Sequence, residues 1–132
     1  EDEDGFDIKQ GRGGIRDIEF LAQGLQLVHA PGYPDLPEGN TRKALEKLAA
    51  HGLLDRNEAA SLRSDYAFLR RAEHYLQILE DRQMHRLPEN RDRLASFARC
   101  LLGVDAAIED LIRELNRIRH RVTESYRQHI HN

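Results

Sequence analysis

Apolar side chains recur every three to four residues along most of the chain, with polar side chains between them. This period predicts amphipathic helices that each bury one face. The first predicted helix runs from Ile15 to about His29, before the turn-forming residues 31–34. Its apolar face consists of Ile15, Ile18, Ala22, Leu25 and Val28.

Capping residues delimit the next two predicted helices. Asn40 is a favourable N-cap for a short helix at 41–51, and Gly52 fits the position after its end. Residues 55–58 resemble a capping box, which opens a long third helix ending near Gln83. The apolar face of this third helix consists of Leu62, Tyr66, Leu69, Leu76 and Leu79.

Two further helices complete the predicted fold. Asn90 caps a fourth helix that ends at Leu102, and Asp105 caps a last helix. The pattern therefore predicts an all-α fold, an antiparallel bundle of about five helices at 15–132, which we expect to be monomeric. A short extended segment at 6–9 precedes it, and we expect residues 1–10 to be loose or irregularly packed. The last helix carries Ile108, Leu111, Ile112, Leu115, Ile118 and Val122.

Composition narrows the class of protein. The 132 residues suit one domain, and a net charge of −3 does not favour general nucleic-acid binding. No apolar run reaches membrane-spanning length, and the acidic start is unlike a signal peptide. The single cysteine, Cys100, cannot form an internal disulfide, so we expect a reduced, cytoplasmic setting with Cys100 in the core.

A glycine-rich turn leads into the first helix and carries the first candidate site. Lys9, Gly13 and Gly14 precede the helix, and Arg16 and Asp17 lie in its first turn. Glycine permits close backbone approach, and a helix start attracts anions. Asp17 begins an otherwise apolar stripe, so it needs a partner. It either bonds to its own helix amides or orders the glycine turn beside a neighbouring active site.

Two polar stripes carry the remaining candidates. Glu19 shares one with Arg16, Gln23 and Gln26, which is either a solvated face or an interface. The other lies on the third helix and is either solvated or a cationic wall for phosphates or an acidic partner. It consists of Arg63, Arg70, His74, Gln77 and Asp81, with Arg71 one step away. On the last helix Arg113, Arg117 and Arg121 form a stripe that we interpret as solvated.

Two motifs carry a family resemblance. Residues 13–20, Gly-Gly-Ile-Arg-Asp-Ile-Glu-Phe, follow Asp7-Ile8-Lys9 and are similar to a signature of the bacterial glutamine-synthetase adenylyltransferase family. Residues 66–77, followed by Arg86-Leu87-Pro88, are similar to the second long helix of that family. The likeness extends from Phe6 to about Leu102.

The resemblance implies a helical domain that follows a nucleotidyltransferase domain and that is shared with the PII uridylyltransferase. Residues 1–14 would then be a linker and a remnant of the preceding domain. Mg²⁺ and ATP would serve the full-length enzyme, whose catalytic carboxylates belong to the preceding domain. We therefore expect no metal, no cofactor and no catalytic residue in this fragment, and little activity from it alone.

Three functions remain open at this stage. The chain is the helical part of an adenylyl-transferring or adenylyl-removing enzyme, an effector-binding regulatory module, or a plain helical interaction domain. The motifs look more like the adenylyl-removing half, with the transferring half also open. The implied partners are the preceding nucleotidyltransferase domain, glutamine synthetase and a PII signal protein, with no nucleic acid or membrane.

Overall fold

The computed structural model describes residues 6–80 and 85–130, and within them the chain is all-α, as predicted. Apart from helices, these residues contain one isolated β-bridge, between Asp7 and Arg86. The helices are α1 (Ile15–His29), α2 (Thr41–Ala50), α3 (Arg56–Glu80), α4 (Arg91–Leu102) and α5 (Ile108–His129), with a short 3₁₀-helix η2 (Ala30–Gly32) after α1.

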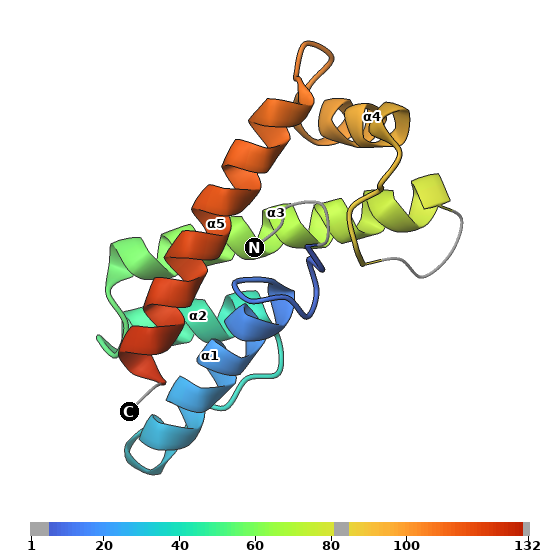
Figure 1. The fold of residues 1–132 in the computed structure, drawn as a ribbon. Coiled ribbons are helices and arrows are strands. Elements are labelled where there is room, and N and C mark those ends of the chain that lie inside the picture. The colour runs from blue at the N-terminus through green and yellow to red at the C-terminus, as the bar shows by residue number, and fades with distance from the viewer. Residues whose placement is uncertain (1–5, 81–84, 131–132) are drawn as a thin grey trace.

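The long helix α3 is the element around which the others are arranged (Figure 1). Helix α2 lies antiparallel to its first half, and α1 packs against α2, α3 and α5. Helix α4 packs against α3 and α5 on the other side of the molecule. All five helices contribute apolar side chains to one continuous core.

The predicted caps Asn40 of α2 and Asn90 of α4 are confirmed. At α3 the Asp55 cap forms, while the Glu58 carboxylate bonds to Ser125 and His129 of α5 rather than completing a capping box. The Asn40 side chain accepts from the Lys43 amide at 3.0 Å, and the Asn90 side chain accepts from the Arg93 amide at 3.1 Å. Asp55 accepts from two amides of the first turn of α3. The predicted end of α3 near Gln83 lies outside the described residues.

Three sequence predictions about individual residues of α1, α4 and the start of α5 are wrong. Helix α5 begins after Ala107 rather than at Asp105, because the Asp110 carboxylate accepts from the Ala107 amide at 2.8 Å. Val28 is 69% exposed, although its spacing placed it on the apolar face of α1. Cys100 is also exposed rather than in the core.

Residues 6–10 are anchored in the bundle rather than loose. Phe6 and Ile8 are buried in the core. The Ile8 amide donates to the His85 carbonyl at 2.7 Å, and the Leu87 amide donates to the Phe6 carbonyl at 3.3 Å. The described part of the segment therefore pairs with the chain that follows α3.

The turn between this segment and α1 fits against the middle of α5. Gly13 has a φ of +79°, and a β-carbon there would lie 2.6 Å from the Arg119 carbonyl oxygen. The Arg119 guanidinium lies 4.1 Å from the centre of the Phe6 ring, and its Nε donates to the Arg12 carbonyl. Only glycine satisfies both the backbone angle and the distance at position 13.

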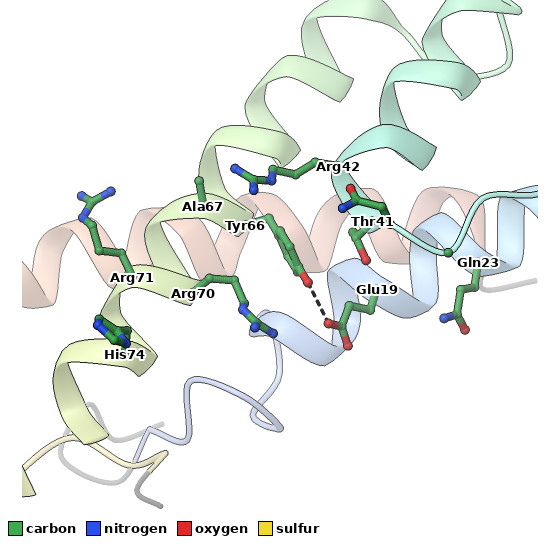
Figure 2. A pocket seen from close by; sticks show the side chains of 11 residues that line it. Glu19, Gln23, Thr41, Arg42, Tyr66, Ala67, Arg70, Arg71 and His74 are labelled. Carbon is green, nitrogen blue, oxygen red and sulfur yellow. Dashed lines mark hydrogen bonds between the residues drawn. The ribbon is translucent and has the colours of Figure 1, made fainter. Parts of the chain in front are cut away.

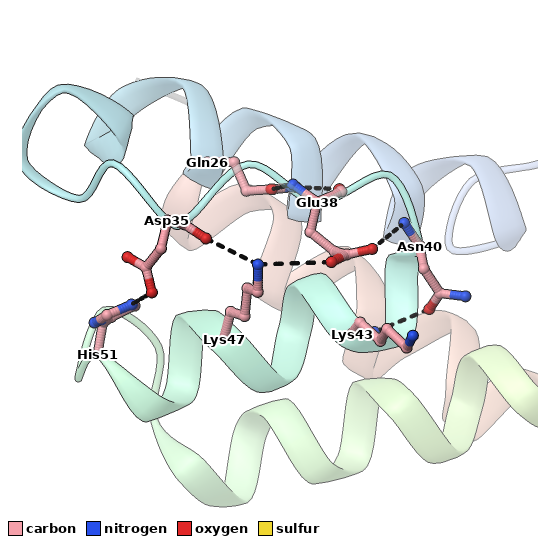
Figure 3. Close-up of polar contacts among 7 residues, drawn as sticks. All are labelled: Gln26, Asp35, Glu38, Asn40, Lys43, Lys47 and His51. Atoms are coloured by element: carbon pink, nitrogen blue, oxygen red, sulfur yellow. Dashed lines mark hydrogen bonds and ion pairs between the residues drawn. The ribbon is translucent and has the colours of Figure 1, made fainter.

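The loop between α1 and α2 is fixed by polar contacts at several points (Figure 3). The buried Gln26 side chain exchanges two hydrogen bonds with the backbone of Glu38, at 2.6 and 3.2 Å. Lys47 donates to the Asp35 carbonyl and lies 3.6 Å from the Glu38 carboxylate. These bonds hold the loop, and with it the start of α2, against α1.

One buried ion pair joins α3 to α5. The Asp65 carboxylate is 3% exposed and receives two hydrogen bonds from the Arg121 guanidinium, at 2.9 and 2.5 Å. This bond to Asp65 raises the pKa of Arg121. Arg121 is thus not part of a solvated stripe, whereas Arg113 and Arg117 pair with acids on their own helix.

We expect Gly13→Ala to destabilise the chain more than Gly52→Ala. Both glycines have positive φ, +79° and +75°, so alanine is strained at either position by about 1–3 kcal/mol. Only position 13 adds a clash with α5, worth about 1–3 kcal/mol more, since position 52 faces open space. Urea denaturation measures both variants, and equal losses would show that the contact with Arg119 is loose.

We expect Asp65→Asn to lower the free energy of unfolding by about 2–3 kcal/mol, because it leaves a charged guanidinium without its carboxylate. The matched control is Glu124→Gln, which disrupts an exposed pair with Arg127 and should cost under about 0.5 kcal/mol. Thermal or urea unfolding measures both. A loss at Asp65 no larger than at Glu124 would contradict the structural role of the buried pair.

Candidate functional site

Four of the predicted site residues meet on one open hollow at the surface between α1, α2 and α3 (Figure 2). Glu19 comes from α1, and Arg70, Arg71 and His74 come from α3. The hollow has a volume of about 700 Å³. Its lining also includes Gln23, Gly39, Asn40, Thr41, Arg42, Tyr66 and Ala67.

A hydrogen bond between α3 and α1 forms the floor of this hollow. The Tyr66 hydroxyl donates to the Glu19 carboxylate at 2.9 Å (Figure 2). Burial raises the pKa of Tyr66, and although the Thr41 side chain lowers it, the bond to Glu19 again raises it, so the pKa stays above its usual value. The phenol therefore remains a protonated donor at neutral pH, and Glu19 is held at a fixed position.

Arginine side chains give the hollow its positive charge. Arg70 lies 3.7 Å from the buried Glu73 carboxylate and 5.9 Å from the centre of the Tyr66 ring. Arg71 lies 5.4 Å from the Phe68 ring, and Arg42 extends from the start of α2 (Figure 2). Among the described residues, the structure records no hydrogen bond or ion pair for the side chains of Arg42 and Arg71.

The other predicted site residues lie at the glycine turn and do not line the hollow. Asp17 accepts from the Gly13 amide at 2.7 Å, so its carboxylate orders the turn directly. The Lys9 carbonyl accepts from the Arg16 amide at 2.8 Å, and the Arg16 guanidinium lies over the Phe20 ring. A β-carbon at Gly14 would lie 2.5 Å from the Ile8 carbonyl oxygen. The predicted site residues thus form two separate groups, one at the hollow and one at the glycine turn, and each group includes residues of α1.

The two polar stripes are only partly solvated. Gln26 is buried against the loop that precedes α2, as described above. Arg63 pairs with Glu46 of α2 at 2.6 Å and is not among the residues that line the hollow. Arg70 and His74 line the hollow, and Asp81 lies outside the described residues.

Sequence reasoning missed several residues of the hollow, among them Thr41, Arg42 and Tyr66. Arg42 and Thr41 reach it because α2 packs beside α3, a contact that helical spacing does not reveal. Tyr66 was assigned to the apolar face of α3, and its ring is half-buried with the hydroxyl directed at Glu19. A half-buried tyrosine usually directs its hydroxyl toward a polar partner, and this property is the one feature of the sequence that could have indicated Tyr66.

The described residues contain no group of three or more histidine, cysteine, aspartate or glutamate side chains arranged to hold a metal ion. The hollow offers Glu19 as its one carboxylate in this part of the chain, and that carboxylate is already bonded to Tyr66. The arrangement therefore suits the binding of an anion better than the binding of a cation. Separately, none of the described helices is long and apolar enough to cross a membrane.

Comparison with known proteins gives consistent relatives. The chain is 43% identical over 103 residues to the bifunctional glutamine synthetase adenylyltransferase/adenylyl-removing enzyme of Bradyrhizobium sp. (strain ORS 278), covering 78% of this chain and 10% of the relative. It is 48% identical over 92 residues to the enzyme of the same name from Xanthomonas axonopodis pv. citri, covering 67% and 10%. For Thioalkalivibrio sulfidiphilus the identity is 39% over 127 residues, covering 94% and 13%.

The chain thus spans about a tenth of the length of the curated relatives it matches. A protein family described as GlnD PII-uridylyltransferase matches residues 2–130, nearly the whole chain. The match includes the glycine turn and every residue of the hollow. The chain therefore belongs to the GlnD PII-uridylyltransferase family, and it is similar to a helical part of the bifunctional glutamine synthetase adenylyltransferase/adenylyl-removing enzymes.

Proposed function

We propose that the chain is a helical domain of a bifunctional glutamine synthetase adenylyltransferase/adenylyl-removing enzyme. In this role it supports transfer of an adenylyl group to glutamine synthetase, or its phosphorolytic removal, in the regulation of nitrogen metabolism. The observation that carries the proposal is the cationic hollow. It gathers Glu19, Arg70, Arg71 and His74 from two motifs far apart in the sequence.

The chemistry of the hollow favours a division of labour with a preceding nucleotidyltransferase domain. Adenylyl transfer requires divalent metal at the phosphates, commonly held by paired carboxylates. The hollow offers guanidinium groups, which fit phosphate oxygens, but no free carboxylate pair within the described residues. ATP and Mg²⁺ would accordingly be held mainly by the preceding domain, with this chain supplying a cationic wall.

The glycine turn is the proposed contact with that domain. Asp17 and the close packing of Gly13 on Arg119 hold residues 6–14 in one conformation, so the direction from which the chain enters α1 is fixed. Lys9, Gly14, Arg16 and Asp17 would then set the position of the helical domain beside the catalytic one. Glutamine synthetase is the proposed substrate, and the proposed setting is the cytoplasm.

A second candidate is a regulatory module of a PII-uridylyltransferase type of protein. The family description that matches residues 2–130 favours it, because that description refers to a PII-modifying enzyme. In this case the same hollow would bind an effector such as glutamine, or contact a PII signal protein. Titration of the chain with glutamine and with a PII protein separates the candidates, since saturable binding of either supports the regulatory module.

We expect Gly14→Val, Arg16→Ala and Asp17→Asn each to reduce adenylyl transfer or removal strongly in the full-length enzyme while leaving helical content near native. Asp17→Asn keeps the size of the side chain but weakens the bond that orders Gly13. The measurements are activity assays with circular dichroism. Glu109→Gln, on an exposed position of α5, is the control and should be nearly silent.

A different outcome would assign the glycine turn a purely structural role. If Asp17→Asn unfolds the chain, and activity falls only in proportion to the folded fraction, Asp17 is a helix cap. The proposed contact with the catalytic domain would then be wrong.

We expect the chain alone to bind ATP or ADP weakly in the presence of magnesium, because the metal ligands lie in another domain. Isothermal titration calorimetry should show no tight binding. A micromolar dissociation constant for the isolated chain would contradict the division of labour.

A further inference from the structure

We propose that the hollow contains a metal-independent binding site for a phosphate group, formed by Arg42, Arg70, Arg71 and the first turn of α2. The participation of α2 is the new element, because neither sequence motif includes it. The proposal rests on the proposed function only for the identity of the phosphate carrier in the full-length enzyme. Binding itself is a property of this chain and is tested on it.

The charges of the lining residues make the hollow positive on a protein that is negative overall. Three arginines line it, and Glu19 is the one acidic residue of its lining among the described residues. The whole chain has a net charge of −3. Positive charge concentrated in a concave surface attracts anions more strongly than the same charge on a flat surface.

Several other arginines of the described chain already have carboxylate partners, and Arg70 of the hollow itself lies 3.7 Å from the Glu73 carboxylate. Arg63 and Arg121 pair with acids of a neighbouring helix, and Arg113, Arg117 and Arg127 pair with acids on α5. The side chains of Arg42 and Arg71 have no such recorded partner in the described ranges. An external anion can therefore bind to either of these guanidinium groups without breaking a recorded ion pair.

The start of α2 adds hydrogen-bond donors at the same place. Gly39, Asn40, Thr41 and Arg42 all line the hollow, so the positive end of the α2 dipole lies at its wall. The Asn40 side chain caps the Lys43 amide. No acceptor among the described residues is recorded for the Thr41 and Arg42 amides. Free amides at a helix start together with arginine forks are a combination typical of phosphate sites.

The position of this helix start does not depend on the ligand. The Asn40 amide donates to the Glu38 carboxylate at 3.1 Å, and Glu38 is bonded through its backbone to the buried Gln26 (Figure 3). Within the hollow, the hydrogen bond between Tyr66 and Glu19 holds α3 against α1. The backbone donors at the start of α2 are thus held in place before binding, which reduces the entropy lost when an anion binds.

The test is an NMR titration of ¹⁵N-labelled chain with inorganic phosphate at constant ionic strength and without magnesium. We expect saturable shifts of the Thr41 and Arg42 amides and of the Arg42, Arg70 and Arg71 side-chain Nε–H groups, with a millimolar dissociation constant. A second arm uses AMP, and tighter binding of AMP than of phosphate identifies a nucleotide as the carrier. Equal or weaker binding identifies free phosphate.

Variants separate a built site from general attraction of anions. Arg42→Ala and Arg71→Ala should each weaken binding about fivefold to tenfold, and Arg42→Lys should be intermediate because it keeps charge without the planar fork. Lys43→Ala is the matched control and should leave affinity unchanged, because Lys43 is an exposed cation next to Arg42 in the sequence that does not line the hollow.

Two results would overturn the phosphate site. Shifts that rise linearly without saturation, or equal losses in Lys43→Ala and Arg42→Ala, would show attraction to net charge only. The glycine-turn variants are assayed in the full-length enzyme, so a negative NMR titration of the chain does not contradict the proposed function. Conversely, glycine-turn variants that retain full activity do not contradict the phosphate site.

Discussion

The contact between Gly13 and the backbone of α5 at Arg119 is the constraint on which the rest of the structure depends. A β-carbon at position 13 would lie 2.6 Å from the Arg119 carbonyl oxygen, so this approach requires glycine. The same contact fixes the start of α1 against α5 and places Phe6 under the Arg119 guanidinium. Residues 6–14 consequently become part of the bundle, and the Asp17 carboxylate completes the turn by accepting from the Gly13 amide.

The arrangement of charge separates the structural arginines from those available for binding. Arg121 satisfies the buried Asp65, and the arginines on the outer face of α5 are neutralised by acids three residues away. At the hollow, Arg42 and Arg71 have no recorded carboxylate partner in the described ranges, whereas Arg70 lies 3.7 Å from the Glu73 carboxylate. Glu19 accepts from Tyr66, and Glu46 pairs with Arg63. The positive charge of the hollow therefore results from how carboxylates are distributed over the chain, because the chain as a whole has a net charge of −3.

Local sequence predicted the helices well because their limits depend on nearby residues. Asn40 and Asn90 cap the helices that follow them, and Gly52 adopts the positive φ expected after α2. The start of α5 was misplaced because Asp105 and Asp110 are both plausible capping acids, and only Asp110 bonds to the N-cap amide. Val28 follows the spacing of the α1 core, yet its side chain is 69% exposed, which the spacing alone does not reveal.

The candidate site was predictable only in part, because it depends on contacts between helices. The motifs indicated Glu19, Arg70, Arg71 and His74, but not that α2 would bring Arg42 to the same place. Similarly, Arg121 has the same spacing as the exposed Arg117, and only the packing of α5 on α3 reveals its buried partner. Helical spacing gives the face of each residue on its own helix, whereas tertiary packing decides what that face contacts.

Helix α1 is the one element shared by the glycine turn and the hollow. Asp17 in its first turn holds the glycine turn, and Glu19 lies on the hollow. Further along, Gln26 is bonded to the loop that carries the start of α2. Because hydrogen bonds along the helix make it stiff, the position of the glycine turn and that of the cationic hollow are set together. A domain attached before residue 6 would therefore be oriented relative to the hollow by the same contacts that stabilise the fold.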